Sequence, residues 1–105
     1  MANDKTECQA VREVFEGHAD QLRMSSTKSM HGHLIGGTGA VELLACIMAL
    51  REGVIAPTIN HQVDDPNCDL NIVANTAQQA EIKATLSNAF AFGGLNAVIA
   101  LTKAP

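Results

Sequence analysis

Apolar residues at helical spacing predict two helices in the first half of this chain. The first is expected over residues 4–16, where an apolar stripe runs from Ala10 to Phe15, and Gly17 is expected to end it. The second is expected over residues 38–51, with Gly53 just beyond its C-terminal end. Helical structure is therefore predicted to dominate up to about residue 51.

Shorter apolar segments predict strands between and after these helices. The expected strands cover residues 23–27, 58–60, 70–73, 84–88 and 97–102. A turn rich in histidine and glycine is expected over 29–39, a loop over 64–67, and a tight turn at Gly93-Gly94. This order predicts one α/β unit, residues 1–105, in which a mixed sheet packs on a helix and the chain ends in two joined strands.

The second predicted helix has almost no polar face. Residues 40–50 read AVELLACIMAL, so Glu42 is their one charged residue. A helix that is apolar all round is expected to be buried all round. A chain of 105 residues buries only a modest fraction of its surface and cannot easily enclose such a helix. The pattern therefore predicts that part of the protein is missing here or is supplied by a partner.

Composition narrows the class of protein. With 47% hydrophobic and 17% charged residues, the chain is expected to fold into a globular domain. A net charge of −4, with no Trp or Tyr, argues against nucleic-acid binding. No apolar run is long enough for a membrane span, and no export signal is evident at the N-terminus. Three widely spaced cysteines without a CxxC pair predict reduced thiols in a cytoplasmic protein.

Glu42 is unusual because it is a single carboxylate in a helix that looks buried. Buried carboxylates are normally paired, protonated or functional. The nearest plausible cation in the sequence is Lys28. Spacing alone leaves two interpretations open: Glu42 pairs with Lys28, or it sits unpaired at a gap open to solvent.

His31 and His33 flank a glycine just before the second predicted helix. Such a pair could ligate zinc together with His18, His61 or a cysteine, but no second pair of ligands has regular spacing. A helix N-terminus favours a neutral imidazole and negative charge on a bound substrate. His33 is therefore a candidate hydrogen-bond donor to a developing oxyanion, and a purely structural role is the alternative.

Two glycine-rich segments each allow more than one interpretation, and the first of them is not a phosphate loop. The segment Gly36–Gly39 is followed by Ala40 and Val41 where a phosphate loop needs Lys and Ser or Thr. Close packing of the backbone in a tight turn explains it better. The segment Phe92–Gly94 is either a simple hairpin turn or a turn whose backbone N–H groups face a ligand, with Phe92 as a movable wall.

Taken together, these segments resemble the C-terminal part of the β-ketoacyl-[acyl carrier protein] synthase family, of the ketosynthase II type, which has the thiolase-like fold. The matching segments, in family order and spacing, are SSTKS at 25–29, GHLIG at 32–36, GAVE at 39–42, PTIN at 57–60, CDL at 68–70 and SNAFAFGGLN at 87–96. Because all six are in register over nearly the whole chain, the resemblance is specific.

The resemblance implies roles for particular residues. His33 resembles the second active-site histidine, which polarises the malonyl thioester carbonyl during decarboxylation. Lys28 resembles the active-site lysine, and Glu42 the buried glutamate that pairs with it. Phe92 resembles the gating phenylalanine whose backbone N–H contributes to the oxyanion hole. The implied substrate-binding residues around it are Phe90, Gly93, Gly94 and Asn96, and the acidic residues expected after the family's first histidine motif are Asp4 and Glu7.

The implied activity is decarboxylative Claisen condensation of an acyl thioester with malonyl-acyl carrier protein, in fatty acid or polyketide biosynthesis. The family uses no metal and no cofactor beyond the carrier's phosphopantetheine arm, and forms homodimers; no nucleic-acid or membrane partner is expected. Its nucleophilic cysteine and first histidine lie upstream of this region, so the chain alone is expected to be catalytically incomplete. The alternatives are an inactive truncated fragment and a non-catalytic subunit similar to a chain-length factor, although retention of His33 and Lys28 argues mildly against the latter.

Three positions depart from the family pattern. His31 stands where threonine is usual, Ala91 replaces a glycine of the gating loop, and Leu95 replaces a threonine after the paired glycines. If the family's backbone at position 91 needs a positive φ, Ala91 stiffens the gate. These departures predict either a specialised ketosynthase, such as a polyketide or nodulation type, or a degenerating copy.

Overall fold

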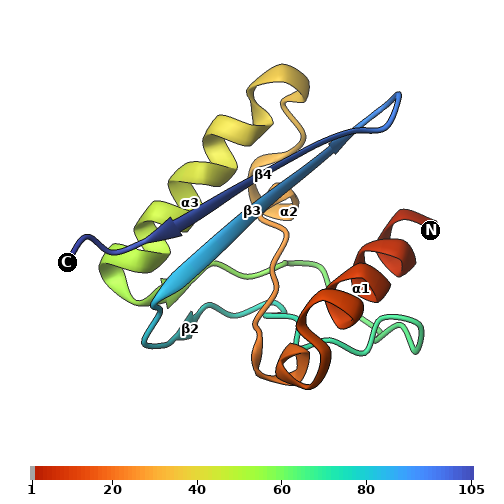
Figure 1. Ribbon diagram of the computed structural model, residues 1–105, viewed down its shortest axis with the longest axis horizontal. Coiled ribbons are helices and arrows are strands. Elements are labelled where there is room, and N and C mark those ends of the chain that lie inside the picture. The colour runs from red at the N-terminus through yellow and green to blue at the C-terminus, as the bar shows by residue number, and fades with distance from the viewer. Residues whose placement is uncertain (1) are drawn as a thin grey trace.

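A computed structural model describes residues 2–105 as a mixed α/β arrangement (Figure 1). The elements in chain order are α1 (Ala2–Phe15), the 3₁₀ helix η1 (Glu16–Gln21), α2 (Lys28–His31), the 3₁₀ helix η2 (Ile35–Gly37), α3 (Thr38–Glu52), β1 (Val54–Ile55), β2 (Gln78–Gln79), β3 (Ala84–Ala91) and β4 (Leu95–Thr102). Figure 1 shows the long β3–β4 hairpin running beside α3, with α1 on the other side of the molecule. None of the helices described is long and apolar enough to cross a membrane.

The first helix is confirmed, but Gly17 does not end it. α1 stops at Phe15, and Glu16, the first residue of η1, takes a left-handed conformation with a φ of 50°. A residue in that conformation ends many helices, and glycine usually occupies it because glycine has no Cβ to clash. Here the left-handed residue is a glutamate, one position before the glycine that was expected to end the helix.

The C-terminal hairpin is confirmed and is longer than predicted. β3 and β4 pair antiparallel from Ala84–Thr102 to Ala91–Leu95. The turn between them contains Gly93 and Gly94 with φ values of 84° and 80°, which glycine adopts without strain. Ala91 is not among the residues with a positive φ. The prediction that Ala91 stiffens the gate therefore loses its physical basis in this structure.

The other three predicted strands form only isolated bridges. Met24 bridges Ile72, and Thr58 bridges Ala74, both in parallel orientation. The segment around residue 73 lies between the other two, since Val73 N–H donates to the Met24 carbonyl at 2.8 Å and Thr58 N–H donates to the Val73 carbonyl at 2.8 Å. Each segment is extended, as predicted, but a single bridge does not make a ladder. A short pair that the pattern did not predict, β1 with β2, forms instead.

The expected all-round burial of α3 is not reached within this chain. Only its first residue, Thr38, and the pair Ala49 and Leu50 near its end are buried. Leu44 remains 59% exposed and Met48 48% exposed. One side of α3 packs on β1, β3 and β4, because those are the elements that this chain supplies. The bare side agrees with the expectation that another polypeptide segment covers it.

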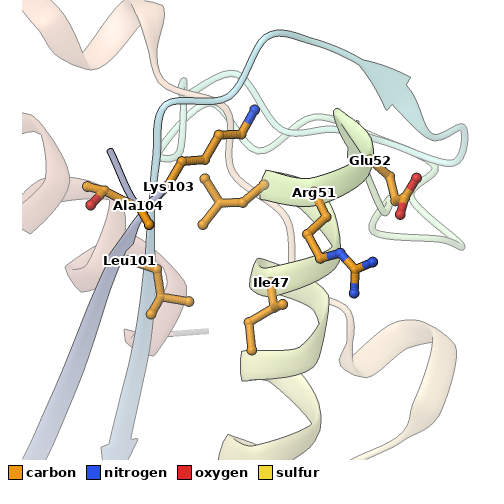
Figure 2. Close-up of a pocket in the computed structure, with 8 residues that line it drawn as sticks. Ile47, Arg51, Glu52, Leu101, Lys103 and Ala104 are labelled. Atoms are coloured by element: carbon orange, nitrogen blue, oxygen red, sulfur yellow. The ribbon is translucent and has the colours of Figure 1, made fainter.

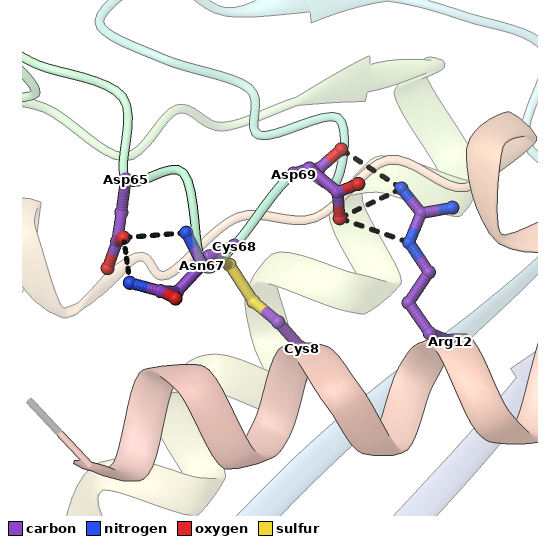
Figure 3. Close-up of a disulfide and its surroundings, with 6 residues drawn as sticks. All are labelled: Cys8, Arg12, Asp65, Asn67, Cys68 and Asp69. Atoms are coloured by element: carbon purple, nitrogen blue, oxygen red, sulfur yellow. Dashed lines mark hydrogen bonds and ion pairs between the residues drawn. A yellow bond between two sulfur atoms is a disulfide. The ribbon is translucent and has the colours of Figure 1, made fainter.

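A disulfide contradicts the prediction of three reduced thiols. Cys8 of α1 is bonded to Cys68, with their Cα atoms 5.5 Å apart, while Cys46 is free (Figure 3). Cys8, Ala19 and Leu70 form a buried cluster at this point. One turn further along α1, Arg12 Nε donates to Asp69 Oδ1 at 3.1 Å. The bond and these contacts fix α1 against the 64–70 segment.

Candidate functional site

Lys28 and Glu42 form an ion pair, as the resemblance implied. Lys28 Nζ donates to Glu42 Oε1, which joins the first residue of α2 to the fifth residue of α3. The Glu42 side chain is 14% exposed and the Lys28 side chain 39% exposed. The alternative of an unpaired Glu42 at a solvent gap is therefore wrong. The pair holds a cation at the N-terminal end of α3 without leaving a buried carboxylate unpartnered.

Breaking this pair is expected to destabilise the chain. Glu42→Gln keeps the side-chain volume but removes the charge that Lys28 meets, and a hydrogen bond to a charged group contributes about 1.5–3 kcal/mol. Urea unfolding of the 105-residue chain should show a loss in this range. Glu52→Gln, at the exposed C-terminal end of the same helix, is the matched control and should change little. Equal effects of the two substitutions would contradict the structural importance of the pair.

Helix α1 adds further negative charge to the Lys28–Glu42 pair. Burial raises the pKa of Glu7, the nearby Asp4 and Glu42 carboxylates raise it further, and the Lys28 ammonium acts in the opposite direction. Glu7, one of the two acidic residues that the resemblance places after the family's first histidine motif, therefore lies within reach of the Lys28–Glu42 pair and of Asp4.

The raised pKa of Glu7 predicts a pH-dependent stability difference. A carboxyl whose folded-state pKa lies above its unfolded value binds its proton more tightly when folded, so its contribution to stability falls as pH rises from about 4.5. Glu7→Gln removes this effect and is expected to raise the melting temperature at pH 7. The gap between variant and wild type should close toward pH 4. A gap that does not change with pH would contradict the assignment.

His33 lies on the loop that leads into α3 and is exposed to solvent. The backbone N–H of Ile35 donates to His33 Nδ1 at 3.0 Å, and the Thr38 hydroxyl lies 2.8 Å from the same nitrogen. Because a backbone N–H can only donate, Nδ1 is an acceptor and the neutral ring carries its hydrogen on Nε2. His33 therefore presents Nε2–H, the kind of donor that the predicted oxyanion role requires.

The hydrogen bonds of His31 place the ring hydrogen on Nδ1, the opposite nitrogen from that of His33. Its Nδ1 lies 2.7 Å from the Gly32 carbonyl oxygen, which can only accept, so Nδ1 carries the hydrogen. Its Nε2 lies 2.9 Å from the Thr27 hydroxyl. Both ring nitrogens are thus engaged within the chain. Within residues 2–105, no group of three or more His, Cys, Asp or Glu side chains is placed to hold a metal ion, and the zinc alternative has no geometric support.

The turn residues lie at the same end of the molecule as the start of α3 (Figure 1). Phe92 is fully exposed at the tip of the hairpin, and Phe90 is 48% exposed beside it. Gly93 and Gly94 form the turn, and Asn96 pairs with Phe90 across the two strands. The structure thus places Phe92 at a free tip, while the surface that it would face is not built by this chain.

None of the three cysteines is suited to act as a nucleophile. Cys8 and Cys68 are consumed in the disulfide. Burial raises the pKa of the Cys46 thiol and Glu42 adds to this, while the hydroxyls of Thr85 and Ser87 act in the opposite direction. A raised pKa keeps the thiol protonated, and the thiolate is the reactive form. None of the three cysteines therefore offers a thiol with the lowered pKa that favours a nucleophile.

A cavity of about 530 Å³ lies at the opposite end of α3 (Figure 2). Its apolar wall includes Ile47, Leu50 and Leu101, and the charged side chains of Arg51 and Lys103 stand at its edge. Glu42 of the Lys28–Glu42 pair lies near the N-terminal end of α3, whereas the cavity residues lie in its last turns and around the C-terminal end of β4. The cavity is therefore separate from the candidate site.

The contacts of His33 include two residues that the sequence analysis did not single out for that role. Ile35 adopts a left-handed backbone with a φ of 55°, which is rare for a β-branched residue. Thr38 was predicted as the first residue of the second helix and as part of a glycine-rich turn, with no contact to His33. No pattern in the sequence predicts a left-handed isoleucine. The two hydrogen-bond partners of His33 Nδ1 can therefore be identified only from the folded chain.

The arrangement of α3 beside a long hairpin, with a Lys–Glu pair and a histidine donor before the helix, defines a ketosynthase-type chain of the thiolase-like fold. Residues 1–62 match the family model described as "Beta-ketoacyl synthase, C-terminal domain". The chain therefore belongs to the β-ketoacyl synthase family.

Among curated relatives, nodulation protein E of Rhizobium sp. (strain N33) is 50% identical over 99 residues, which cover 94% of this chain and 25% of that protein. The 3-oxoacyl-[acyl-carrier-protein] synthase 2 of Synechocystis sp. is 44% identical over 102 residues, which cover 97% of this chain and 24% of that protein. This chain therefore spans about a quarter of the length of the curated relatives that it matches.

Solved structures agree with this assignment. The ishigamide ketosynthase/chain length factor matches with a TM-score of 0.92 at 40% identity, over 99% of this chain and 25% of that one. A type II polyketide synthase ketosynthase in complex with its acyl-carrier protein matches with a TM-score of 0.90 at 32% identity, over 93% of this chain and 24% of that one. The chain thus has the fold of the C-terminal portion of these ketosynthases.

Proposed function

We propose that this chain is the C-terminal part of a 3-oxoacyl-[acyl carrier protein] synthase, which joins an acyl thioester to malonyl-acyl carrier protein by decarboxylative Claisen condensation. The observation that carries the proposal is His33, which presents Nε2–H at the N-terminus of α3 beside the Lys28–Glu42 pair. A carrier-bound substrate is supported by the related ketosynthase structure, which contains an acyl-carrier protein. Within the proposal no metal takes part, and the carrier's phosphopantetheine arm delivers the substrate.

His33 would act in the decarboxylation step. As the bond between the malonyl α-carbon and its carboxylate breaks, CO2 leaves and the electron pair moves toward the thioester oxygen as an enolate. Nε2–H of His33 donates to that oxygen, and the hydrogen bond strengthens as negative charge grows. The positive end of α3 and the Lys28 ammonium favour the same charge. The enolate carbon then attacks the acyl thioester, and the thiolate that carried the acyl group leaves.

Phe92 and its neighbours would complete the site from the hairpin tip. The proposed role of the Phe92 backbone N–H is to donate to the acyl thioester oxygen during carbon–carbon bond formation, with Phe90, Gly93, Gly94 and Asn96 shaping the substrate channel. The exposed position of Phe92 supports this assignment, because a residue at a free tip is available to face a substrate.

The missing functions would come from the part of a ketosynthase that this chain does not contain. Acyl transfer needs a thiolate nucleophile, and the cysteines here are bonded or protonated. The bare side of α3 supports the same conclusion, because an apolar groove of about 420 Å³ runs beside Met30, Met48 and Val54. We therefore expect the chain alone to be inactive. The homodimer, the cytoplasmic location and the choice between fatty acid and polyketide synthesis remain predictions.

A non-catalytic subunit is the second candidate, because one matching solved structure is a ketosynthase/chain length factor. The experiment begins with the intact mass of the protein in its source cells, using an antibody against residues 61–80. Release of labelled CO2 from malonyl-acyl carrier protein is then measured for that species and for the 105-residue chain. The proposal expects release by a larger species only. Release of CO2 by the 105-residue chain would contradict the expectation that this chain is catalytically incomplete. If no species that contains the chain releases CO2, the non-catalytic subunit is favoured.

A further inference from the structure

The first residue of α3 has an unusual environment for a threonine. Thr38 is 5% exposed, and among the residues whose burial the structure describes it is the one polar side chain in the buried class. Its hydroxyl faces back along the chain toward the loop before the helix. The Leu34 backbone N–H donates to Thr38 Oγ1 at 2.7 Å, and Oγ1 lies 2.8 Å from His33 Nδ1.

The directions of these hydrogen bonds follow from which groups can only donate. The Leu34 N–H uses a lone pair of the Thr38 oxygen, which leaves the hydroxyl hydrogen free to point at His33 Nδ1. The Ile35 N–H donates to the same nitrogen at 3.0 Å. Nδ1 therefore receives two donors, one from the loop backbone and one from the helix.

The two donors differ in rigidity. Ile35 holds its N–H in place through a left-handed backbone with a φ of 55°, and its side chain is 86% exposed. Such a conformation in a β-branched residue persists only where surrounding contacts maintain it. Thr38 is buried at the start of a helix of 15 residues and is fixed by that helix. Its hydroxyl, which also binds Leu34 N–H, is therefore the contact that ties the strained loop to a rigid element.

We propose that Thr38 is the positioning residue of His33: its hydroxyl fixes the imidazole with Nδ1 as acceptor and directs Nε2–H toward the thioester oxygen of a malonyl substrate. This inference rests on the proposed function, because the role of the directed donor is catalytic. Thr38 itself touches no reacting atom. Its effect is on the orientation of the ring, which matters because a donor displaced by about 1 Å can lower a rate by roughly 10²-fold.

The test compares Thr38→Val with Thr38→Ser. Valine keeps the shape and removes the hydroxyl, whereas serine restores it. In the ketosynthase that carries this chain, Thr38→Val is expected to lower kcat for malonyl decarboxylation roughly 10- to 100-fold with little change in KM, because the lost contact acts on the transition state. Thr38→Ser is expected to recover most of the rate.

The neighbouring histidine offers a matched control. Thr27 contacts His31 Nε2 at 2.9 Å, the same kind of contact at a similar distance. Thr27→Val removes that hydroxyl from a histidine with no proposed catalytic role, and it is expected to leave kcat unchanged. If Thr27→Val and Thr38→Val lower kcat equally, the effect is general to the loop and the proposal is overturned.

A measurement that does not depend on enzyme activity separates this inference from the proposed function. The ¹⁵N shift of His33 Nδ1 in the labelled 105-residue chain reports the hydrogen bonds that this nitrogen accepts. Thr38→Val is expected to move that shift toward the value of a free pyridine-type nitrogen, and Thr38→Ser is expected to retain the wild-type shift. An unchanged shift in Thr38→Val overturns the role of Thr38 even where the enzyme is active. A wild-type enzyme without decarboxylase activity overturns the proposed function and leaves the shift result to stand on its own.

If Thr38→Val does not fold, Thr38→Ala removes the same hydroxyl without adding a branched side chain. An unchanged His33 Nδ1 shift in folded Thr38→Ala would overturn the role of the hydroxyl.

Discussion

Replacing His33 with alanine is expected to slow malonyl decarboxylation by about 10²–10³-fold in the ketosynthase that carries this chain, which is the usual cost of removing one oxyanion donor. The geometry gives the reason: Nδ1 is occupied by the Ile35 and Thr38 donors, and Nε2–H has no hydrogen-bond partner among residues 2–105. The measurement is the rate at which labelled CO2 is released from malonyl-acyl carrier protein.

His31→Ala is the matched control for this substitution. Both ring nitrogens of His31 are engaged by the residues that flank α2, Gly32 and Thr27, so its loss removes no free donor. We expect less than about a 10-fold effect, since His31 makes ordinary hydrogen bonds only. Transfer of the acyl group to the enzyme, measured separately, should survive His33→Ala. Loss of acyl transfer and decarboxylation together would show that the substitution damages the fold instead of the donor.

The elements predicted well from the sequence are those with long, regular patterns. The eleven-residue apolar run over 40–50 predicted α3, and two apolar segments around a Gly-Gly turn predicted β3 and β4. The segments around Met24, Thr58 and Val73 were harder, because their strand character depends on partners far away in the chain. The segment around Val73 forms one isolated bridge with each of the other two, so the local preference for an extended backbone is met without a ladder.

Some contacts of the candidate site were likewise predictable from the sequence, and others were not. Sequence spacing left the Lys28–Glu42 pair open, the family resemblance favoured it, and the structure makes the contact. The donors to His33 Nδ1 could not be predicted, since one depends on the left-handed backbone of Ile35 and the other on the direction of a single hydroxyl. The Lys28–Glu42 contact was thus easier to predict than the contacts that hold His33 in place.

The disulfide was missed for a related reason. Cysteine count and spacing do not reveal pairing, and Cys8 and Cys68 are separated by 60 positions. Their meeting depends on α1 packing against the 64–70 segment, where Arg12 binds Asp69 and the Cys8–Ala19–Leu70 cluster is buried. Composition and cysteine spacing contain no information about that packing, so they led to the prediction of reduced thiols.

Reduction of the Cys8–Cys68 bond is expected to lower the free energy of unfolding of the 105-residue chain by about 4 kcal/mol. The bond closes a loop of 60 positions in the unfolded chain, and the loss of loop-closure entropy accounts for an effect of this size. The loop contains Lys28, His33 and Glu42, so the same bond restricts the unfolded freedom of the whole candidate site. Urea unfolding with and without a thiol reductant measures the difference.

Two cysteine variants make this measurement specific. Cys8→Ser should show the reduced stability under both conditions, while Cys46→Ser should keep the full response to reductant, because Cys46 is free. Counting reactive thiols in the unfolded, unreduced chain gives an independent answer: one if the bond is present, and three if it is absent. Three reactive thiols together with identical unfolding curves would contradict the bond. The packing of α1 on Leu70 would then have to hold the Asp4–Glu7 turn near Lys28 without a covalent link.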